Sequence, residues 1–193
     1  MKKKRENIRV SRLPEITRNI IPEKLRSAFD ELIADSGGTV PIGPGSVAAL
    51  SPEMALRRRA LSNYVRWELN FPQVFQELVI LVTARAMDCG YVWNAHAELA
   101  RNAGASSSLV DAIRERKEIP SDTPQDLQTI VEFTNALLTQ HYTADDVYGT
   151  ALSLLGTQNL IDVIALIGQY VTNSMFINSF ELEIPDSTEP KMI

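Results

Sequence analysis

Residues 77–96 read ELVILVTARAMDCGYVWNAH and contain most of the chemically informative side chains of the chain. As far as Met87 the segment is apolar at nearly every position, which is typical of a helix buried on several sides. The tripeptide Asp-Cys-Gly at 88–90 then indicates a break, and the residues to about Asn102 favour a second helix. The stretch therefore predicts two consecutive helices, which can fold against each other.

Helical periodicity extends over nearly the whole chain. Apolar side chains at 25, 28, 29, 32 and 33 form one stripe, and the Gly-Gly pair at 37–38 ends that helix. The glycines and prolines of residues 38–44 predict a loop. Further helices are expected at residues 52–70, 72–87, 90–102, 109–116, 124 to about 141, 143–155 and 158–180. No alternation of period two persists over a useful length, so we predict an all-α fold without a sheet.

The predicted helix at residues 158–180 is apolar on almost every side. Such a helix is either buried at the centre of a protein or shared between subunits. Its richest apolar run, residues 160–171, is shorter than the ~20 residues that a membrane-spanning helix needs. The basic start at residues 1–5 is not followed by the apolar region of a secretory signal, and we interpret it as a solvated terminus. We therefore expect a soluble, cytoplasmic protein without a membrane partner.

The composition excludes several classes of function. The 193 residues, 45% of them apolar, suffice for a core, and a net charge of −5 disfavours nucleic-acid binding. The single cysteine excludes a disulfide within the chain, a Cys-x-x-Cys redox pair and a zinc cluster of several cysteines. Two histidines 45 positions apart lack the spacing typical of metal ligands, and no Gly-rich phosphate loop or serine-nucleophile elbow is present. We expect no metal, no cofactor and a small-molecule substrate.

Glu77 and His96 are the first candidates for chemistry. An unpaired carboxylate among apolar neighbours is costly, so Glu77 lies either on an exposed stripe or beside a partner, for which Arg85 is one possibility. His96 is seven residues, and about 10 Å of backbone, from Cys89, so a direct thiolate–imidazole pair is disfavoured. A group of the preceding helix, such as Glu77, is a better partner for His96. The second histidine, His141, is expected at a solvated helix end.

Cys89 has two interpretations. At the start of a helix its thiol would feel the positive end of the helix dipole, which favours the thiolate. A small buried apolar residue is the common alternative for a lone cysteine. The aromatic residues Tyr91 and Trp93 can likewise line a substrate pocket or pack in the core.

These residues resemble the signature of the carboxymuconolactone decarboxylase family, which includes the alkylhydroperoxidase D type. In that superfamily a glutamate precedes a Cys-x-x-Cys-x-x-x-His element by twelve residues. Glu77, Cys89 and His96 occupy those positions, and Val92 replaces the second cysteine. The resemblance covers residues 45–182, and its further motifs are Leu50-Ser51-Pro52-Glu53, Asn159-Leu160-Ile161-Asp162, Leu166-Ile167-Gly168-Gln169-Tyr170 and Asn173.

The resemblance implies an alkylhydroperoxidase D-like helical bundle that forms homo-oligomers, commonly dimers, trimers or hexamers. It implies that Glu77 and His96 belong to a proton relay, that Cys89 lies at the reacting site, and that Tyr91, Val92 and Trp93 line the pocket. The expected organisation is an N-terminal arm at 1–45 with a helix and a Gly/Pro loop, a family domain at 46–184 and a tail at 185–193.

Val92, in place of the second cysteine of the motif, disfavours peroxidase activity by disulfide cycling. Disulfide cycling needs a second thiol to resolve a sulfenate, and this chain has none. Acid–base decarboxylation of a small organic acid or lactone needs no thiol pair and is our leading hypothesis. The first alternative is a peroxidase of the peroxiredoxin type that uses Cys89 with an external thiol. The second alternative is a non-catalytic oligomeric scaffold.

Overall fold

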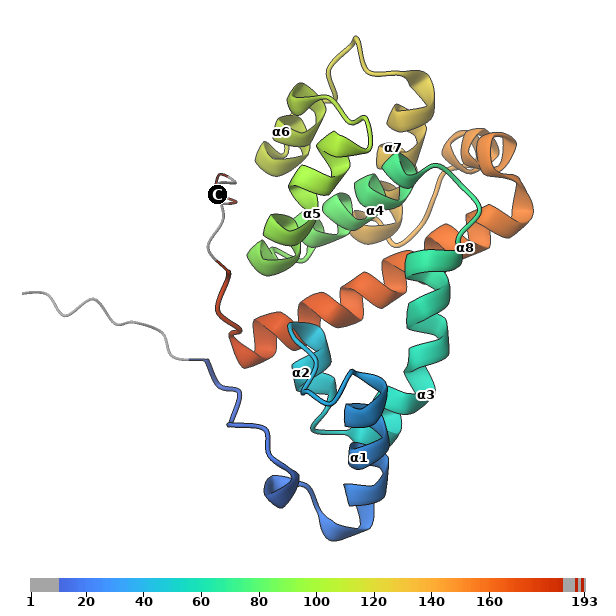
Figure 1. The fold of residues 1–193 in the computed structure, drawn as a ribbon. Coiled ribbons are helices and arrows are strands. Elements are labelled where there is room, and N and C mark those ends of the chain that lie inside the picture. Colours follow the sequence, from blue (N-terminus) through green and yellow to red (C-terminus); the bar gives the residue numbers. More distant parts are fainter. Residues whose placement is uncertain (1–10, 186–189, 191, 193) are drawn as a thin grey trace, which may run out of the picture.

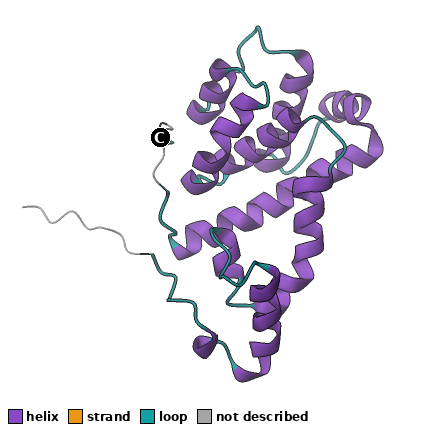
Figure 2. Cartoon of the chain, in the orientation of Figure 1, coloured by secondary structure: helices purple, strands orange, loops and turns teal. Residues whose placement is uncertain are grey.

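The computed structural model describes residues 11–185, 190 and 192, and over these residues it contains helices and no strand (Figure 2). The predicted all-α class is confirmed. The eight α-helices are α1 (Arg26–Asp35), α2 (Pro44–Ala48), α3 (Pro52–Asn63), α4 (Gln73–Ala86), α5 (Gly90–Asn102), α6 (Ser107–Glu115), α7 (Gln125–Thr139) and α8 (Asp145–Phe180). The interpretations of residues 1–5 and of most of the tail fall outside the described residues.

Two groups of helices lie on either side of the second half of α8 (Figure 1). The larger group contains α4 to α7, and α4 packs against α5, α7 and α8. The smaller group contains α1, α2 and α3, with an apolar core of its own made by Ile21, Phe29, Leu32, Ala48, Ala49 and Ala55. The helix α8 therefore touches both groups, which is consistent with its apolar composition.

Helix α4 is the most buried element of the larger group. Every residue from Phe75 to Arg85 is buried, including the polar ones. The Nε2 atom of Gln76 donates to the backbone carbonyls of Val65 and Arg66, which satisfies that buried amide. Pro72 immediately precedes the helix, so the predicted start is displaced by one residue.

Glycines end or bend the helices where the sequence predicts it. Gly37, Gly38 and Gly104 have positive φ values after α1 and α5. Gly156, with φ 71° and ψ 169°, interrupts the helical backbone inside α8, so the predicted boundary there is a sharp bend. Helix α8 begins at Asp145, two residues after the predicted start at 143, and has no side-chain cap.

The segment after Pro52 differs from its prediction. Helix α3 ends at Asn63 and continues as a π-helix, Tyr64–Glu68. Leu61 is 50% exposed, whereas Arg58 is half-buried between α3 and α8. The apolar pattern of this helix is weak, so contacts with other helices decide which face is covered.

Helix α8 has the length and hydropathy of a membrane-crossing helix, because it extends well beyond the apolar run at residues 160–171. It packs against α2, α4 and α7. Core helices of soluble proteins have the same composition. Ile161 and Ile164 remain exposed on its outer side, so this chain alone does not cover the whole helix.

Candidate functional site

The packing of α5 against α4 brings Glu77 and His96 together. The Nδ1 atom of His96 lies 2.7 Å from the Oε2 atom of Glu77. The side chain of Glu77 has no exposed surface, and that of His96 is 11% exposed. The contact that we expected between the two helices is therefore present, and the alternative of an exposed Glu77 is wrong.

Glu77 has a second partner, Arg66, which the sequence pattern does not predict. The Nη1 atom of Arg66, in the π-helix, donates to the Oε1 atom of Glu77 at 3.0 Å. Arg85, the partner considered from sequence, instead pairs with Asp88. The carboxylate is thus held from both sides, by Arg66 and by the imidazole of His96.

These partners determine the ionisation of Glu77. Burial by itself raises the pKa of the carboxyl group, but the hydrogen bond and charge of His96, and then the charge of Arg66, outweigh it. The pKa of Glu77 is therefore lowered. A buried carboxylate with two cationic or hydrogen-bonding neighbours remains ionised near neutral pH.

Tyr170 of α8 contacts the other nitrogen of the imidazole. Its hydroxyl lies 3.3 Å from the Nε2 atom of His96, and the two rings meet edge to face at 5.2 Å. Burial, together with the charge of Glu77, raises the pKa of Tyr170 to about 12. The phenol therefore remains a hydrogen-bond donor at all ordinary pH values.

The four side chains form one hydrogen-bonded chain in the order Arg66, Glu77, His96 and Tyr170. With Glu77 ionised, the Nδ1–H group of His96 donates to the carboxylate, and Nε2 accepts from Tyr170. This arrangement fixes the ring and stabilises positive charge on it. The Nε2 atom can then accept or release a proton.

Cys89 occupies a different environment. It immediately precedes α5, has no exposed surface and belongs to the main apolar core. Burial raises the pKa of its thiol, and the opposing effects of the Val92 and Tyr91 backbone amides and of the Ser174 hydroxyl are smaller. Of the two interpretations of Cys89, the small buried residue agrees with the structure, and the thiolate stabilised by the helix dipole does not, since desolvation prevails.

The three expected pocket residues separate in the structure. Val92 and Trp93 are buried in the core, whereas Tyr91 lines a cavity of about 440 Å³ beside the end of α8. Gly43, with φ 58°, approaches the ring so closely that a Cβ there would lie 2.9 Å from the Tyr91 hydroxyl oxygen. Tyr91 alone of the three thus lines this cavity.

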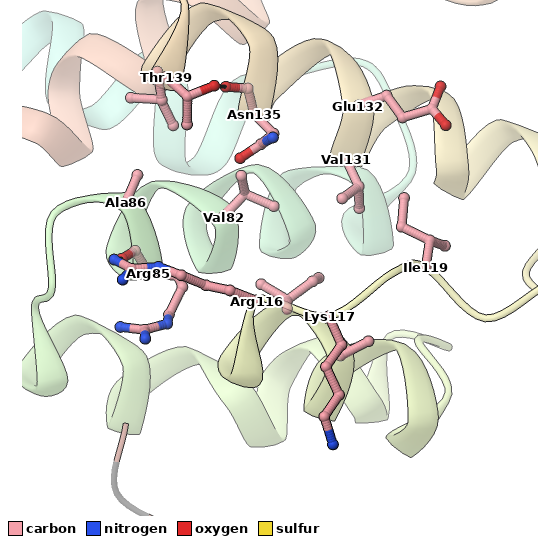
Figure 3. Close-up of a pocket in the computed structure, with 13 residues that line it drawn as sticks. Val82, Arg85, Ala86, Arg116, Lys117, Ile119, Val131, Glu132, Asn135 and Thr139 are labelled. Atoms are coloured by element: carbon pink, nitrogen blue, oxygen red, sulfur yellow. Dashed lines mark hydrogen bonds between the residues drawn. The ribbon is translucent and has the colours of Figure 1, made fainter. Parts of the chain in front are cut away.

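A separate cavity of about 380 Å³ lies between α4, α6 and α7 (Figure 3). Its wall is mainly apolar, and Arg85, Arg116 and Lys117 lie along it (Figure 3). Arg116 donates to Asp88 and to the Arg85 carbonyl, and Lys117 pairs with Glu115. These cations are therefore already paired, and neither Glu77, Cys89 nor His96 lines this cavity.

Among the residues that the structure describes, no three His, Cys, Asp or Glu side chains are grouped so that they could hold a metal ion. His141 is exposed just after α7, with φ 59°. The described site is thus a set of side chains that can donate and accept protons.

The chain matches known proteins in sequence profile and in fold. Residues 52–134 match the carboxymuconolactone decarboxylase family, and this segment contains Glu77, Cys89 and His96. No curated protein matches the chain in sequence.

Several solved structures are similar in fold, including the following three. An uncharacterized peroxidase-related protein from Ralstonia eutropha JMP134, described as an alkylhydroperoxidase core, has a TM-score of 0.67 at 15% identity, over 92% of this chain and 94% of that one. The debrominase Bmp8, solved with 2,3,4-tribromopyrrole, has a TM-score of 0.63 at 13% identity, over 92% of each chain. A peroxidase-related protein from Silicibacter sp. TM1040 has a TM-score of 0.61 at 15% identity, over 89% and 88%.

At these identities the likeness to solved structures concerns the fold alone. The profile match covers residues 52–134, and Glu77, Cys89 and His96 lie within this segment. Residues 52–134 of the chain thus match the carboxymuconolactone decarboxylase family, and the chain has an alkylhydroperoxidase D-like fold.

Proposed function

We propose that the protein is an enzyme that performs acid–base chemistry on a small organic acid or lactone, with His96 as the general acid and base. The observation that carries this proposal is the hydrogen-bonded chain from Arg66 through Glu77 and His96 to Tyr170. The Nε2 atom of His96 does not contact Glu77, and it can exchange a proton with a substrate once its 3.3 Å contact with the Tyr170 hydroxyl opens.

In the decarboxylation that we propose, the bond between the substrate carbon and its carboxylate breaks, and carbon dioxide leaves. The electron pair of that bond enters the unsaturated system as a dienolate. Protonated His96 then gives the proton on Nε2 to the carbon, and it regains a proton from water, so one proton is consumed for each carbon dioxide released. Glu77 stabilises the positive charge that the imidazole carries before the transfer.

Cys89 has a supporting role in this proposal. Its thiol is buried and its pKa is raised, both of which lower its reactivity as a nucleophile. A thiol in this position can shape the apolar surroundings of the site without entering the reaction.

Thiol-dependent peroxide reduction is the second candidate, favoured by fold neighbours that are described as peroxidase-related. Here the sulfur of Cys89 would attack the peroxide, take one oxygen to become a sulfenic acid and release an alcohol. An external thiol would condense with the sulfenic acid, releasing water, and a second thiol would reduce the mixed disulfide. The external thiols are required because the chain has no other cysteine.

The deciding experiment measures both activities in three variants. We expect His96→Gln to lower turnover of a lactone-acid panel by about 10²–10⁴-fold, as loss of a general acid does. Cys89→Ser should retain this turnover within a few fold, and His141→Gln, at an exposed histidine, is the matched control. The acid–base proposal would be contradicted if only the Cys89 variant lost activity and if the parent chain reduced peroxide in the presence of an added thiol. No turnover in any assay would favour a scaffold.

The proposal includes a homo-oligomeric state and a cytoplasmic location. The exposed apolar residues Ile161 and Ile164 support the first, because apolar side chains that gather on a protein surface are typical of an interface between subunits.

A further inference from the structure

A cavity of about 410 Å³ lies between the small helical group and α8, away from the Glu77–His96 pair. Its walls come from α1, α2, α3 and α8. Helix α8 brings Tyr170 to His96, while Gln169 and Asn173 of the same helix line the cavity. The two regions thus share α8 but use different residues of it.

Two pairs of polar residues meet at the wall of this cavity. Arg58 and Ser62 are four residues apart on α3, and Gln169 and Asn173 are four residues apart on α8, so each pair lies on one helix face. The Nη2 atom of Arg58 donates to the Oδ1 atom of Asn173 at 2.6 Å. The Nε2 atom of Gln169 donates to the hydroxyl oxygen of Ser62 at 2.8 Å. These bonds hold the four groups at the cavity wall.

The hydrogen-bonding capacity that remains consists largely of donors. The hydroxyl of Ser62 accepts from Gln169, so its own hydrogen is available. Asn173 uses its oxygen for Arg58, and its NH₂ group has no partner among the described residues. The guanidinium of Arg58 has five N–H groups, of which one makes the bond to Asn173. A ligand that completes this set must supply acceptors.

The net charge of the residues that line the cavity also favours a ligand with hydrogen-bond acceptors, and in particular an anion. Arg59 is neutralised by Asp35, which also lines the wall. Arg58 has no carboxylate partner among the described residues; its guanidinium lies 5.4 Å from the centre of the Phe176 ring. Desolvation lowers the pKa of Arg58, so its charge is incompletely compensated. The lining therefore carries one positive charge in excess.

The remaining wall is apolar. It is made by Leu32, Pro41, Pro44, Ala48 and Ala55. We propose that this cavity binds a small monocarboxylate with a short apolar body, whose carboxylate meets Arg58, Ser62 and Asn173 and whose body lies against this wall. A guanidinium with neighbouring N–H and O–H donors suits the two oxygens of a carboxylate. This second binding site is separate from the site of the proposed reaction and does not depend on it.

Benzoate is the probe for this proposal, and its uncharged analogue benzamide is the matched ligand. We expect isothermal titration calorimetry on the full chain to detect benzoate binding and to find benzamide at least tenfold weaker. Arg58→Gln should weaken benzoate at least tenfold, because glutamine can still donate to Asn173 but has no charge. Arg57→Gln is the control, since Arg57 is exposed on the same helix and pairs with Glu53.

Asn173→Asp provides a second variant that does not depend on removing Arg58. The new carboxylate would pair with Arg58 inside the protein and compete with the ligand, so benzoate binding should be lost while the melting temperature is kept or raised. Equal benzoate affinity in Arg58→Gln and the parent chain, equal affinity for benzoate and benzamide, or no benzoate binding by the parent chain would each overturn the proposal.

Discussion

The Nδ1 atom of His96 lies 2.7 Å from the Oε2 atom of Glu77, nineteen positions earlier in the chain. The opposite carboxylate oxygen accepts from Arg66. Glu77 is therefore a fully buried acid whose charge depends on two neighbours, and both the stability and the proposed chemistry of the protein depend on its ionisation.

Stability should fall in acid, and Glu77 should be one cause. The folded state lowers the pKa of Glu77 below its ordinary value of 4.5, so its contribution to stability is complete above that value. The contribution is lost as the pH falls from 4.5 through the lowered pKa. Urea unfolding at pH 7 and at successively lower pH values should show a smaller pH dependence in Glu77→Gln than in the parent chain.

Glu98→Gln is the control for this measurement, because Glu98 is exposed on α5. At pH 7 the Glu77 variant should lose about 2 kcal/mol or more, since it leaves Arg66 without its carboxylate. An acid dependence unchanged by Glu77→Gln would contradict the assigned ionisation.

Stability should also fall in alkali, and Tyr170 should contribute. Its pKa of about 12 in the folded protein exceeds the ordinary value of 10, so ionisation between these values favours the unfolded chain. The expected loss between pH 10 and 12 is on the order of 2 kcal/mol. Tyr170→Phe should remove this part of the loss in chemical unfolding, whereas Tyr148→Phe, at an exposed position, should not.

Cys89 should react slowly in the native protein. Its sulfur is inaccessible and the pKa of its thiol is raised, so both access and thiolate content are low. We expect labelling by a disulfide reagent at pH 7 to be slower than in guanidinium chloride by a factor on the order of 100 or more. Rapid and complete native labelling would instead favour the thiol-dependent alternative.

Two glycines of α8 should respond in opposite directions to alanine. Gly156 has φ 71° and ψ 169°, a conformation that alanine adopts only with strain of about 1–3 kcal/mol. Gly168 lies in regular helix, and a Cβ there would meet nothing within 4 Å. Thermal unfolding should show that Gly156→Ala destabilises the protein and that Gly168→Ala stabilises it by up to about 1 kcal/mol. Equal changes in stability in the two variants would contradict the non-helical backbone conformation of Gly156.

The outer side of α8 should mediate association. Ile161 is 61% exposed and Ile164 is 46% exposed in the single chain. If these residues are covered by another subunit, Ile161→Lys should shift the mass in sedimentation velocity towards the monomer. Leu99→Lys, at an exposed position of α5, should leave the mass unchanged. A parent chain that sediments as a monomer would contradict the proposed oligomer.

The contact between Glu77 and His96 could be predicted from the sequence because the two residues lie on consecutive helices. Two helices that follow each other through a short turn have few ways to pack, so the pairing of Glu77 with His96 could be predicted. The glycines after α1 and α5 act through their own backbone, and those helix ends were also predictable.

Arg66 and Tyr170 could not be identified in this way. Tyr170 is 74 positions from His96, and its place in the site depends on how α8 packs against α5. Arg66 points at Glu77 from a π-helix, which leaves no distinct sequence pattern. The sequence also leaves the ionisation of the Cys89 thiol open. The helix dipole favours the thiolate and burial favours the thiol, and the balance between them depends on which residues cover the sulfur.

The π-helix Tyr64–Glu68 makes the length of this segment critical. A π-helix accommodates one residue more than an α-helix of similar length, and deleting one residue would restore α-helical spacing with a rotation of ~100°. That rotation would turn either Arg58 away from Asn173 or Arg66 away from Glu77. The extra residue of the π-helix thus allows the contact of Arg58 with Asn173 and the contact of Arg66 with Glu77 to form in the same structure. Deletion of a single residue in this segment should therefore be tolerated far less well than substitution.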